Sequence, residues 1–336
     1  MIKKIFDAIN KFNLNLKNKT VLTEAATGNF VVTPIIAALA GAKVFALTKE
    51  SKNGTIEEVK KQTYSLAKRV NTVSKIQITT NLDKIDLNKI DILTNLGFLR
   101  PINKSIISKL SPKCVIPLMW EPWEYRKDEL DLDACYEKGI KVYGTNESDP
   151  RLKTMDYIGY IVLYFLLKNK LSPFSANVLV IGYKKFVEPI VYCLNQNNYS
   201  YKKITNYNRK VENINEFDVI VIAENKSPKL IIGKDKNSYI ELNLLSNETL
   251  LIHIAGNVEL KGKNISCEPK EPQKFPYMSV TTDFIDSQAV IDLHTAGLKV
   301  AEGMLEANRL NLSQKEYKNY MESNYPALAF QNKKYW

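Results

Sequence analysis

Short apolar runs alternate with segments of helical period along most of the chain. The runs at 43–47 and 177–182 consist mainly of Val, Ile, Leu, Phe and Ala, which is typical of strands buried on both faces of a parallel sheet. Between such runs, as at 3–13, apolar residues recur every three or four positions, which predicts amphipathic helices. Strands that alternate with helices favour an α/β fold built on parallel sheets.

This pattern places the expected elements along the chain. Pro34 suits the first turn of a helix, and Gly139 suits the position that follows one. Helices are expected near 3–13, 34–40, 56–69, 103–110, 132–138, 155–168 and 292–310, and strands near 19–23, 43–47, 76–79, 90–93, 114–118, 140–143, 177–182, 203–206, 219–223, 240–242 and 250–254.

The helix expected at 155–168 differs from the others because it is apolar nearly all round. A helix of this kind has to be buried on every side. We therefore expect it to join two domains or to pack at the interface of a homodimer.

Length and composition indicate a soluble protein of two domains. The chain has 336 residues, of which 45% are hydrophobic and 25% charged, so it is too long for one ordinary core. Its longest apolar stretch, 157–167, is about half of the ~20 residues that a membrane span needs, so no membrane association is expected. The start at Met1-Ile2-Lys3-Lys4 leads into an amphipathic segment rather than a signal peptide. We expect a cytoplasmic protein.

Cysteine and charge usage argue against several kinds of site. The four cysteines lie far apart, with no pair at metal-ligand spacing, so neither a metal site nor a disulfide framework is expected. The formal net charge is +11, but the lysines are spread along the chain rather than clustered with aromatic residues, as in nucleic-acid binders. No nucleic-acid partner is therefore expected. The surplus of positive charge does favour a small anionic ligand.

Four segments follow one another in a characteristic order: Asp91-Ile92-Leu93-Thr94, residues 130–135, Gly139-Ile140-Lys141-Val142 and the apolar helix at 156–167. Their order and spacing resemble the D-2-hydroxyacid dehydrogenase superfamily, which includes formate and phosphoglycerate dehydrogenases. The likeness extends more loosely to 179–254 and to the final helix. It implies two Rossmann-like or flavodoxin-like α/β domains in the formate and glycerate dehydrogenase arrangement. The substrate domain would be 1–154 plus 290–336, and the Rossmann-like cofactor domain would be 155–289.

The resemblance also implies a nicotinamide cofactor, NAD or NADP, bound at the loop after the strand 177–182. Such loops read Gly-x-Gly-x-x-Gly, where glycines make the tight turn and let the backbone approach the pyrophosphate. Here Gly182 is in register, but Lys184 and Val187 replace the second and third glycines. No acidic ribose ligand follows the next strand, although Arg209 can accept a 2′-phosphate. The expected cofactor-binding residues are Gly182, Lys184, Asn208, Arg209 and Ala223.

A histidine is expected to move the proton in this chemistry. His294 lies in a segment, 292–297, that is similar to the family's catalytic turn, and imidazole titrates near neutral pH. The family's arginine for the substrate carboxylate is missing, because the matching segment after His253 reads Ile254-Ala255-Gly256-Asn257. Arg100 and Arg126 are candidates to replace it, since a guanidinium group binds carboxylate or phosphate with two hydrogen bonds. The expected catalytic residues are His294, Arg126 and Arg100; His253 is a weaker candidate.

Polar loops follow strands of the first domain at their carboxyl ends. Residues 24–30 come directly after the strand 19–23 and before a helix, and residues 96–101 follow another strand in the same way. Open α/β sheets bind ligands at such ends, where free backbone N–H groups attract anions. The unusual segment 120–126 contains two Trp and can form an apolar wall, although plain loop packing explains each of these features too. The expected substrate-binding residues are Glu24, Thr27, Gly28, Asn29, Trp120 and Glu147.

Three functions remain open at this point. The architecture and His294 favour an NAD(P)-dependent oxidoreductase that acts on a small anionic metabolite. The departures at Lys184, Val187 and Gly256, and the missing acidic residue around Asn208, favour a non-redox descendant that binds a nucleotide-like or anionic metabolite. A hydrolase of the adenosylhomocysteinase kind, whose domains are similarly arranged, is a further alternative.

Overall fold

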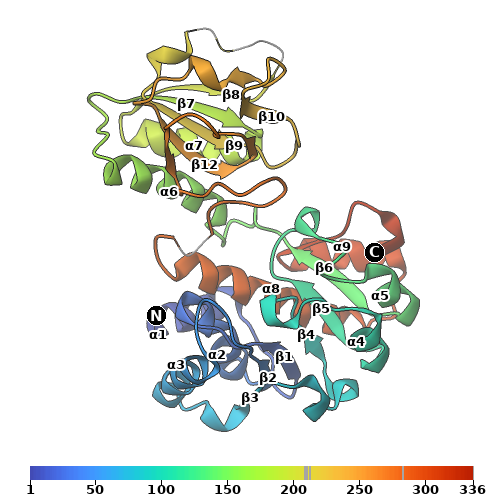
Figure 1. Ribbon diagram of the computed structural model, residues 1–336. Helices are drawn as coiled ribbons and strands as arrows, with labels where there is room; N and C mark the ends of the chain where they lie inside the picture. The colour runs from blue at the N-terminus through green and yellow to red at the C-terminus, as the bar shows by residue number, and fades with distance from the viewer. Residues whose placement is uncertain (208–210, 212, 282–283, 336) are drawn as a thin grey trace. The chain divides into compact units, whose positions relative to one another are not determined.

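The computed structural model describes residues 1–207, 211, 213–281 and 284–335. The chain divides into two compact units (Figure 1): unit 1 consists of Met1–Leu152 with Ser287–Trp336, and unit 2 consists of Lys153–Asp286. The boundaries expected from the sequence, after residues 154 and 289, lie close to these junctions. The assignment of one unit to the substrate and the other to a cofactor stays a prediction.

Unit 1 is built on a seven-stranded sheet. Its strands are β1 (Thr20–Glu24), β2 (Lys43–Leu47), β3 (Ile76–Thr79), β4 (Ile92–Leu93), β5 (Val115–Leu118), β6 (Lys141–Thr145) and β15 (Ala327–Leu328). They lie in the order β15-β6-β5-β4-β1-β2-β3. All run parallel except β15, which pairs with β6 in the antiparallel sense at one edge.

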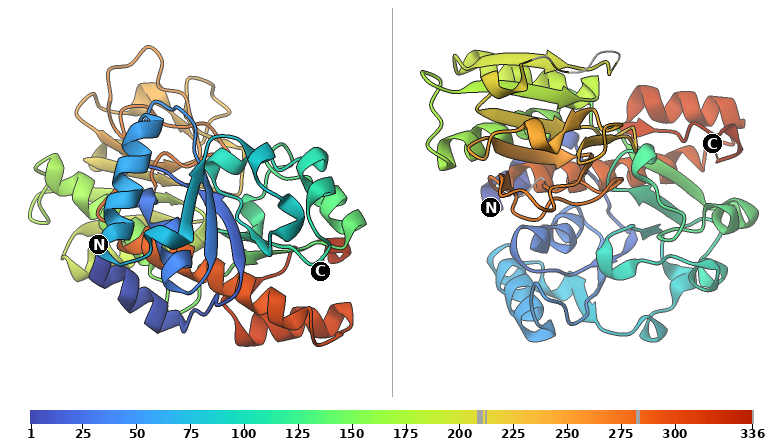
Figure 2. Two further views of the ribbon diagram at one scale, coloured as in Figure 1. Left: turned by 90° about the horizontal axis from the view of Figure 1, so that it is seen from below. Right: turned by 45° about the horizontal axis from the view of Figure 1, so that its top comes forward.

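Helices cover both faces of this sheet. They are α1 (Ile2–Phe12), α2 (Val32–Leu39), α3 (Ile56–Arg69), α4 (Lys104–Lys109), α5 (Leu132–Lys138), α8 (Gln288–Ala307) and α9 (Gln314–Asn324). On one face α1, α2, α3, α8 and α9 share a core with Val21; on the other, α4 and α5 pack with Leu22. These neighbouring residues point to opposite layers because side chains alternate along a strand. Both views of Figure 2 show α8 and α9, in orange and red, beside strands from the first half of the chain.

Local signals at the helix ends agree with these boundaries. Thr55 caps α3: its side chain accepts a hydrogen bond from the Glu58 backbone, and the Glu58 side chain accepts one in return. Ser313 and Glu316 form the same reciprocal pair at the start of α9. Each pair satisfies backbone donors that the first helical turn leaves without partners.

Unit 2 holds a second parallel sheet. Its strands are β7 (Asn177–Gly182), β8 (Ser200–Ile204), β9 (Val219–Ala223), β12 (Leu250–Ala255) and β14 (Ser266–Glu268). Their order is β14-β12-β9-β7-β8, so β7 lies between β8 and β9. The strand β8 forms one edge, and its residues are exposed apart from half-buried Ile204.

The two faces of this second sheet are covered differently. On one face, α6 (Thr154–Lys168) and α7 (Lys184–Gln196) pack with Val178 and Val180. On the other, Leu179 and Ile181 pack against a small sheet made of β10 (Leu230–Gly233), β11 (Ile240–Glu241) and β13 (Asn257–Val258). Doubly wound sheets normally carry helices on both faces. Here the small sheet takes the place of one helical layer.

The predicted α/β class with parallel sheets is confirmed. One side of helix α6 packs on α7 and the sheet, while Tyr160, Tyr164 and Leu167 are exposed within the single chain. Burial of this helix on every side, as at the interface of a homodimer, stays a prediction. The strand expected at 240–242 is β11 of the small sheet, whereas β10, β13, β14, α9 and β15 had no clear signal in the sequence. Within the described residues, no helix has both the length and the hydropathy needed to cross a membrane.

Candidate functional site

Side chains tie together the carboxyl ends of the central strands of unit 1. The Thr94 hydroxyl, just after β4, donates to the Thr23 hydroxyl of β1 over 2.9 Å. The next residue, Asn95, accepts the Met119 N–H at 2.9 Å, directly after β5. Strands β1 and β4 flank the point where the strand order reverses, which is where open α/β sheets bind ligands. The predicted site residues of unit 1 would therefore have to lie at this edge of the sheet to bind a common ligand.

Glu24 ends β1 at this reversal point and is almost fully buried, with 7% of its surface exposed. One carboxylate oxygen accepts the Phe98 N–H at 3.0 Å. A side chain at Gly97 would come within 3.1 Å of the same oxygen, so the loop after β4 closes over the carboxylate. Burial raises the pKa of Glu24, while the Phe98 N–H and the charge of Arg100 oppose the rise. Glu24 therefore keeps its proton to a higher pH than an exposed glutamate does.

Arg100 and Arg126, the two predicted anion ligands, meet at one carboxylate. Arg100 Nη1 lies 2.6 Å from Glu129 Oε1, and Arg126 Nη1 lies 3.6 Å from the same oxygen. About a quarter of each side chain stays exposed, at 27% for Arg100 and 21% for both Arg126 and Glu129. Glu129 is thus a shared partner of two guanidinium groups at this edge, and guanidinium groups are good donors to anions.

Trp120 lies beside Arg100 at the same edge. The Arg100 guanidinium carbon is 5.2 Å from the centre of the Trp120 ring, within cation–π distance. The Trp120 carbonyl accepts the Thr145 N–H at 2.9 Å, which holds its backbone against the end of β6. The indole Nε1 is buried and has no hydrogen-bond acceptor among the described residues. A buried donor without an acceptor is costly, so this group calls for an acceptor from a ligand or from water.

Glu147 lies near the end of β6 and is buried. Its N–H donates to Glu121 Oε1 at 3.2 Å, and the Trp123 indole N–H donates to Glu121 Oε2 at 2.7 Å. Glu121 is therefore held inside the loop by neutral donors. Glu121 and Glu129 were not among the predicted residues, although both lie in or next to the unusual segment 120–126 that pointed to this region.

The loop after β1 forms hydrogen bonds with segments of unit 1 that lie away from Arg100 and Trp120. The Thr27 hydroxyl donates to the Asn53 carbonyl at 2.8 Å, and the Gly28 N–H donates to Gln62 Oε1 at 3.0 Å. Gly28 has a left-handed φ of 64°, and Asn29 follows it in a short 3-10 helix. These contacts hold the loop to α3 and to the segment after β2. The structure brings Arg100, Arg126, Trp120 and Glu24 together, whereas the bonds of Thr27 and Gly28 lead away from them.

His294 lies inside unit 1, between α8 and α2. Its Nδ1 is 2.6 Å from the Thr33 hydroxyl oxygen, and only 4% of the residue is exposed. Burial lowers its pKa to about 4, so the ring is neutral near pH 7. The imidazole thus serves a contact between two helices. The predicted catalytic role of His294 stays a prediction.

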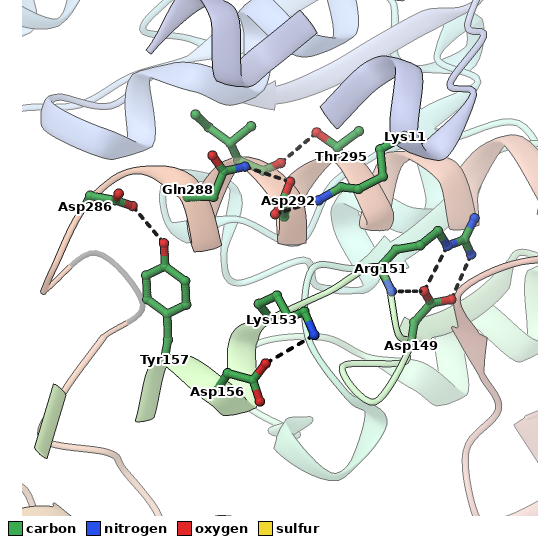
Figure 3. A network of polar contacts seen from close by, with 11 residues as sticks. Lys11, Asp149, Arg151, Lys153, Asp156, Tyr157, Asp286, Gln288, Asp292 and Thr295 are labelled. Atoms are coloured by element: carbon green, nitrogen blue, oxygen red, sulfur yellow. Dashed lines mark hydrogen bonds and ion pairs between the residues drawn. The ribbon is translucent and has the colours of Figure 1, made fainter. Parts of the chain in front are cut away.

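The start of α8 carries a second buried polar group, which the sequence did not single out. Asp292 is 3% exposed and lies 2.7 Å from the Lys11 ammonium of α1. The Gln288 amide donates to its other oxygen at 3.0 Å, as Figure 3 shows. The ion pair anchors α1 to α8, which fixes the helix that carries His294.

In unit 2, the loop after β7 is a tight turn that depends on Gly182. The residue has a φ of 157°, and an added Cβ would lie 2.1 Å from the Ala223 carbonyl oxygen at the end of β9. That oxygen accepts the Tyr183 N–H at 3.1 Å. Helix α7 begins at Lys184, which is exposed, and Val187 is fully buried in the helix–sheet core. Gly182 and Ala223 are thus explained by packing alone.

A hydrogen bond spans the end of β7 in this unit. The Tyr207 hydroxyl, three residues after β8 ends at Ile204, donates to Glu224 Oε2 at 2.6 Å. Glu224 directly follows β9, so the bond joins loops that two strand spacings, about 10 Å, separate. Glu224 is 3% exposed and also accepts the N–H groups of Lys226 and Ser227, at 2.8 and 3.0 Å. Burial and the bond to Glu224 raise the pKa of Tyr207.

Neighbouring side chains fill the same edge of unit 2. The Lys226 ammonium lies 4.2 Å from the centre of the Tyr183 ring, and Lys229 lies 5.5 Å from that of Tyr207. The Tyr207 and Tyr239 rings meet edge to face at 5.0 Å. A dinucleotide needs the backbone to come close at the second glycine position and open space between these loops. Lys184, Tyr207 and Glu224 do not fit that requirement. Asn208 and Arg209, the other predicted cofactor residues, lie outside the described residues.

His253 of β12 forms hydrogen bonds with the segment that follows it. Its Nε2 lies 3.0 Å from the Gly256 carbonyl, and its Nδ1 lies 2.6 Å from the Ser279 hydroxyl, which accepts the Gln273 N–H at 2.7 Å. These distances suit a neutral ring that donates from Nε2 and accepts at Nδ1. Burial lowers the pKa of His253 to about 4. The His253 ring therefore has a structural role. Among the described residues, no group of three His, Cys, Asp or Glu side chains can hold a metal ion.

Comparison with known proteins identifies the fold. No family model and no curated protein sequence matches the chain. A dipicolinate synthase subunit from Bacillus halodurans is 12% identical, with a TM-score of 0.50 over 89% of this chain and 100% of that one. Its counterpart in the dipicolinate synthase of Bacillus subtilis is 11% identical, with a TM-score of 0.50 over 89% and 98%. The pyruvate reductase of Chlamydomonas reinhardtii is 12% identical, with a TM-score of 0.50 over 87% and 97%. The chain has the fold of the D-2-hydroxyacid dehydrogenases, as its sequence suggested.

Proposed function

We propose that this protein binds a small anionic metabolite, with a carboxylate or phosphate group, at the carboxyl edge of the unit 1 sheet. The observation that carries the proposal is the buried Trp120 N–H, which has no acceptor in the described part of the chain and lies beside the Arg100 guanidinium. An anionic oxygen is a good acceptor for both groups. The guanidinium group of Arg126, 3.6 Å from Glu129, adds a second positive charge at this edge.

The class of protein that we favour is a non-redox descendant of the dehydrogenase fold, acting as a metabolite sensor or as an accessory component of a larger enzyme. The Tyr207–Glu224 bond across the end of β7 supports it. So does Lys184, whose side chain stands where a dinucleotide-binding loop has its second glycine. In this class unit 2 keeps its fold for stability and assembly, while unit 1 holds the ligand.

A second candidate is an NAD(P)-dependent oxidoreductase acting on the same kind of metabolite. The Gly182 turn at the start of α7 favours it, because dinucleotide-binding folds place the pyrophosphate at such a turn. The fold shared with the Chlamydomonas pyruvate reductase also supports this candidate. The lowered pKa of His294 and its place between two helices do not favour a proton-transfer role at neutral pH.

Calorimetric titration with pyruvate, glycerate and inorganic phosphate tests the proposed site. Trp120→Phe keeps an aromatic ring but removes the N–H together with the five-membered ring, so it should weaken binding of the preferred probe roughly tenfold. Arg100→Gln should weaken it further, through loss of the charge. The matched control is Trp123→Phe, because the Trp123 N–H already has Glu121 as its acceptor. Equal affinity of the wild type and both site variants would reject the site.

Two measurements separate the candidate classes. Equilibrium dialysis with NADH and NADPH at millimolar concentration should show no binding if the protein is a non-redox descendant. Steady oxidation of either cofactor by a 2-oxo acid would instead establish the oxidoreductase. Both results are independent of the Trp120 titration, because that experiment contains no cofactor.

A further inference from the structure

Strand β8 leaves one edge of the unit 2 sheet open. The order β14-β12-β9-β7-β8 ends with it, and no strand in the described part of the chain pairs with its outer side. In the doubly wound order 3-2-1-4-5-6, β7 takes position 1, β8 position 2 and β9 position 4. Residues 205–218 alone join β8 to β9, which is too short a stretch for a further strand with its crossover helix. The described strands thus leave position 3, beside β8, unfilled.

The backbone groups on this open side belong to Tyr201 and Lys203. The Asn177 carbonyl accepts the Asp218 N–H at 3.0 Å, so residue 177 and every second residue after it in β7 face β9. The residues between them, such as Val178, face β8. Because Val178 lies opposite Tyr201, it bonds to the residues on either side of Tyr201. The N–H and C=O groups of Tyr201 and Lys203 therefore point outward, to where another strand would lie.

Two tyrosines and two lysines flank the open edge. The Lys203 ammonium bonds both carboxylate oxygens of Glu188 in α7, at 2.9 Å each, so Lys203 and Tyr201 lie on the α7 side of the sheet. Tyr192, one helical turn from Glu188, is 66% exposed, and Tyr201 is 36% exposed. Lys202 points to the other face, is exposed, and forms no ion pair with a described residue. The edge thus offers an aromatic surface on one face and a positive charge on the other.

We propose that β8 accepts an extended segment of another protein, in which acidic residues alternate with apolar ones, as an additional strand of the sheet. Hydrogen bonds to the outward backbone groups of Tyr201 and Lys203 supply affinity in this mode of binding, and alternate side chains supply specificity. The apolar side chains of the added strand pack beside Tyr201 and Tyr192. Its acidic side chains lie on the opposite face, where they meet Lys202.

Charge favours an acidic partner over a second copy of this chain. The formal net charge of +11 attracts an acidic segment and repels another copy. Antiparallel pairing of two β8 strands centred on Lys202 would also set the two Lys202 ammonium groups opposite each other, which is unfavourable. Lysines on edge strands commonly prevent such self-association. The same lysine attracts the carboxylates of an acidic strand.

Calorimetric titration of the full chain with two synthetic peptides tests the chemistry of the partner. One peptide alternates Glu with Val over about eight residues, and the other alternates Lys with Val. Only the Glu–Val peptide should bind at millimolar concentration. Lys202→Glu should weaken its binding at least roughly tenfold. Lys274→Glu is the matched control, because Lys274 is exposed and follows β14 at the opposite edge of the sheet. Absence of Glu–Val binding, or equal weakening by both variants, would overturn the proposal.

A backbone substitution tests the addition of a strand. Tyr201→Pro removes an N–H that faces outward and leaves the hydrogen bonds to β7 in place, so it should weaken Glu–Val binding at least roughly tenfold. Tyr201→Val loses the same ring but keeps the N–H, and it should weaken binding less. Circular dichroism shows whether both variants are folded. Equal losses in two folded variants would overturn strand addition.

Hydrogen exchange of the wild type, followed by NMR, gives a test that needs no variant. The Glu–Val peptide should slow exchange of the Tyr201 and Lys203 amide hydrogens, whereas the Lys202 amide, which already bonds to β7, should change little. Binding without protection of Tyr201 and Lys203 would overturn the proposal. Because β8 belongs to unit 2, none of these results depends on the anion site proposed for unit 1.

Discussion

The Tyr207 hydroxyl donates a 2.6 Å hydrogen bond to Glu224, which joins the loops after β8 and β9 over the end of β7. Glu224 accepts two backbone N–H groups besides this hydroxyl. The carboxylate is thus the centre of a small closed network at the edge where dinucleotide-binding folds place their ligand. This network holds Tyr207 against the first residues of the loop after β9.

Loss of the Tyr207 hydroxyl and loss of the Glu224 carboxylate should lower the free energy of unfolding by different amounts. Tyr207→Phe leaves Glu224 with two donors and should lower the free energy of unfolding by about 1 kcal/mol. Glu224→Ala leaves three donors without their acceptor and should cost roughly 3 kcal/mol. Urea unfolding of unit 2 measures both values. Tyr201→Phe, on the exposed strand β8, is the control and should change stability by less than about 0.5 kcal/mol. Similar losses for Tyr207→Phe and Glu224→Ala would contradict this account.

The two histidines should make the protein less stable in mild acid. Burial lowers the pKa of both His253 and His294 to about 4, from the usual 6.5. The unfolded chain therefore binds more protons between about pH 6.5 and pH 4, and stability is full above this window. Each histidine should cost about 1.4 kcal/mol for every pH unit of acidification within it.

Denaturant unfolding from pH 7 to pH 4 checks this pH dependence. His294→Gln should flatten the pH profile of unit 1, and His253→Gln that of unit 2, because glutamine does not titrate. Each variant serves as the control for the other unit. A steep profile that persists in both variants would show that other groups cause the acid sensitivity.

A methyl group at Gly182 should be far more damaging than one at Gly28. Both residues have a positive φ, but an added Cβ at Gly182 would lie 2.1 Å from the Ala223 carbonyl oxygen, whereas the space around Gly28 is open. Gly28→Ala should cost about 1 kcal/mol, the usual cost of a left-handed alanine. Gly182→Ala should cost roughly 3 kcal/mol or more, because β7 and β9 have to move apart. Thermal unfolding of the two variants measures the difference, and equal costs would mean that the Gly182 turn can relax.

The buried ion pair between Lys11 of α1 and Asp292 of α8 should contribute more to the free energy of unfolding than exposed ion pairs do. Lys11→Met leaves the Asp292 carboxylate, 3% exposed, with only the Gln288 amide among the contacts in Figure 3. We expect a loss of about 3 kcal/mol, because a buried charge loses its compensating partner. Lys60→Met removes the exposed pair with Glu57 and should cost less than about 0.5 kcal/mol. Denaturation at neutral pH compares the two, and a small effect of Lys11→Met would indicate that water reaches Asp292.

The sequence predicted the fold well where strands are buried on both faces. Val178 to Ile181 form a continuous apolar run that only a covered parallel strand explains. In the small sheet, β11 lies within the strand expected at 240–242, but β10 and β13 were missed because they are short and lie among polar turns. Helix α6 shows a different limit: Tyr160 and Tyr164 count as apolar in a periodicity analysis, so composition alone cannot tell a face in the chain's own core from one that is exposed in the single chain.

The site was predicted less well, for physical reasons. Arg100 and Trp120 follow β4 and β5, which are neighbours in the sheet; the sequence named both as candidates but did not predict their contact. Glu129 and Glu224 carried no pattern of their own, because their importance depends on which loops the sheet order places beside them. The Lys11–Asp292 pair joins residues far apart in the chain, and such partners emerge only from the packing of α1 on α8.

Unit 1 is assembled from two separated stretches of chain, and this should govern the order in which the protein folds during synthesis. Unit 2 is contiguous, from Lys153 to Asp286, so its residues are all available before α8 leaves the ribosome. Unit 1 has to wait for α8, α9 and β15, which supply part of its core and one edge of its sheet. Its apolar layer around Val21 stays uncovered meanwhile, so nascent chains that stop near residue 286 should depend on chaperones although one of their units is already folded.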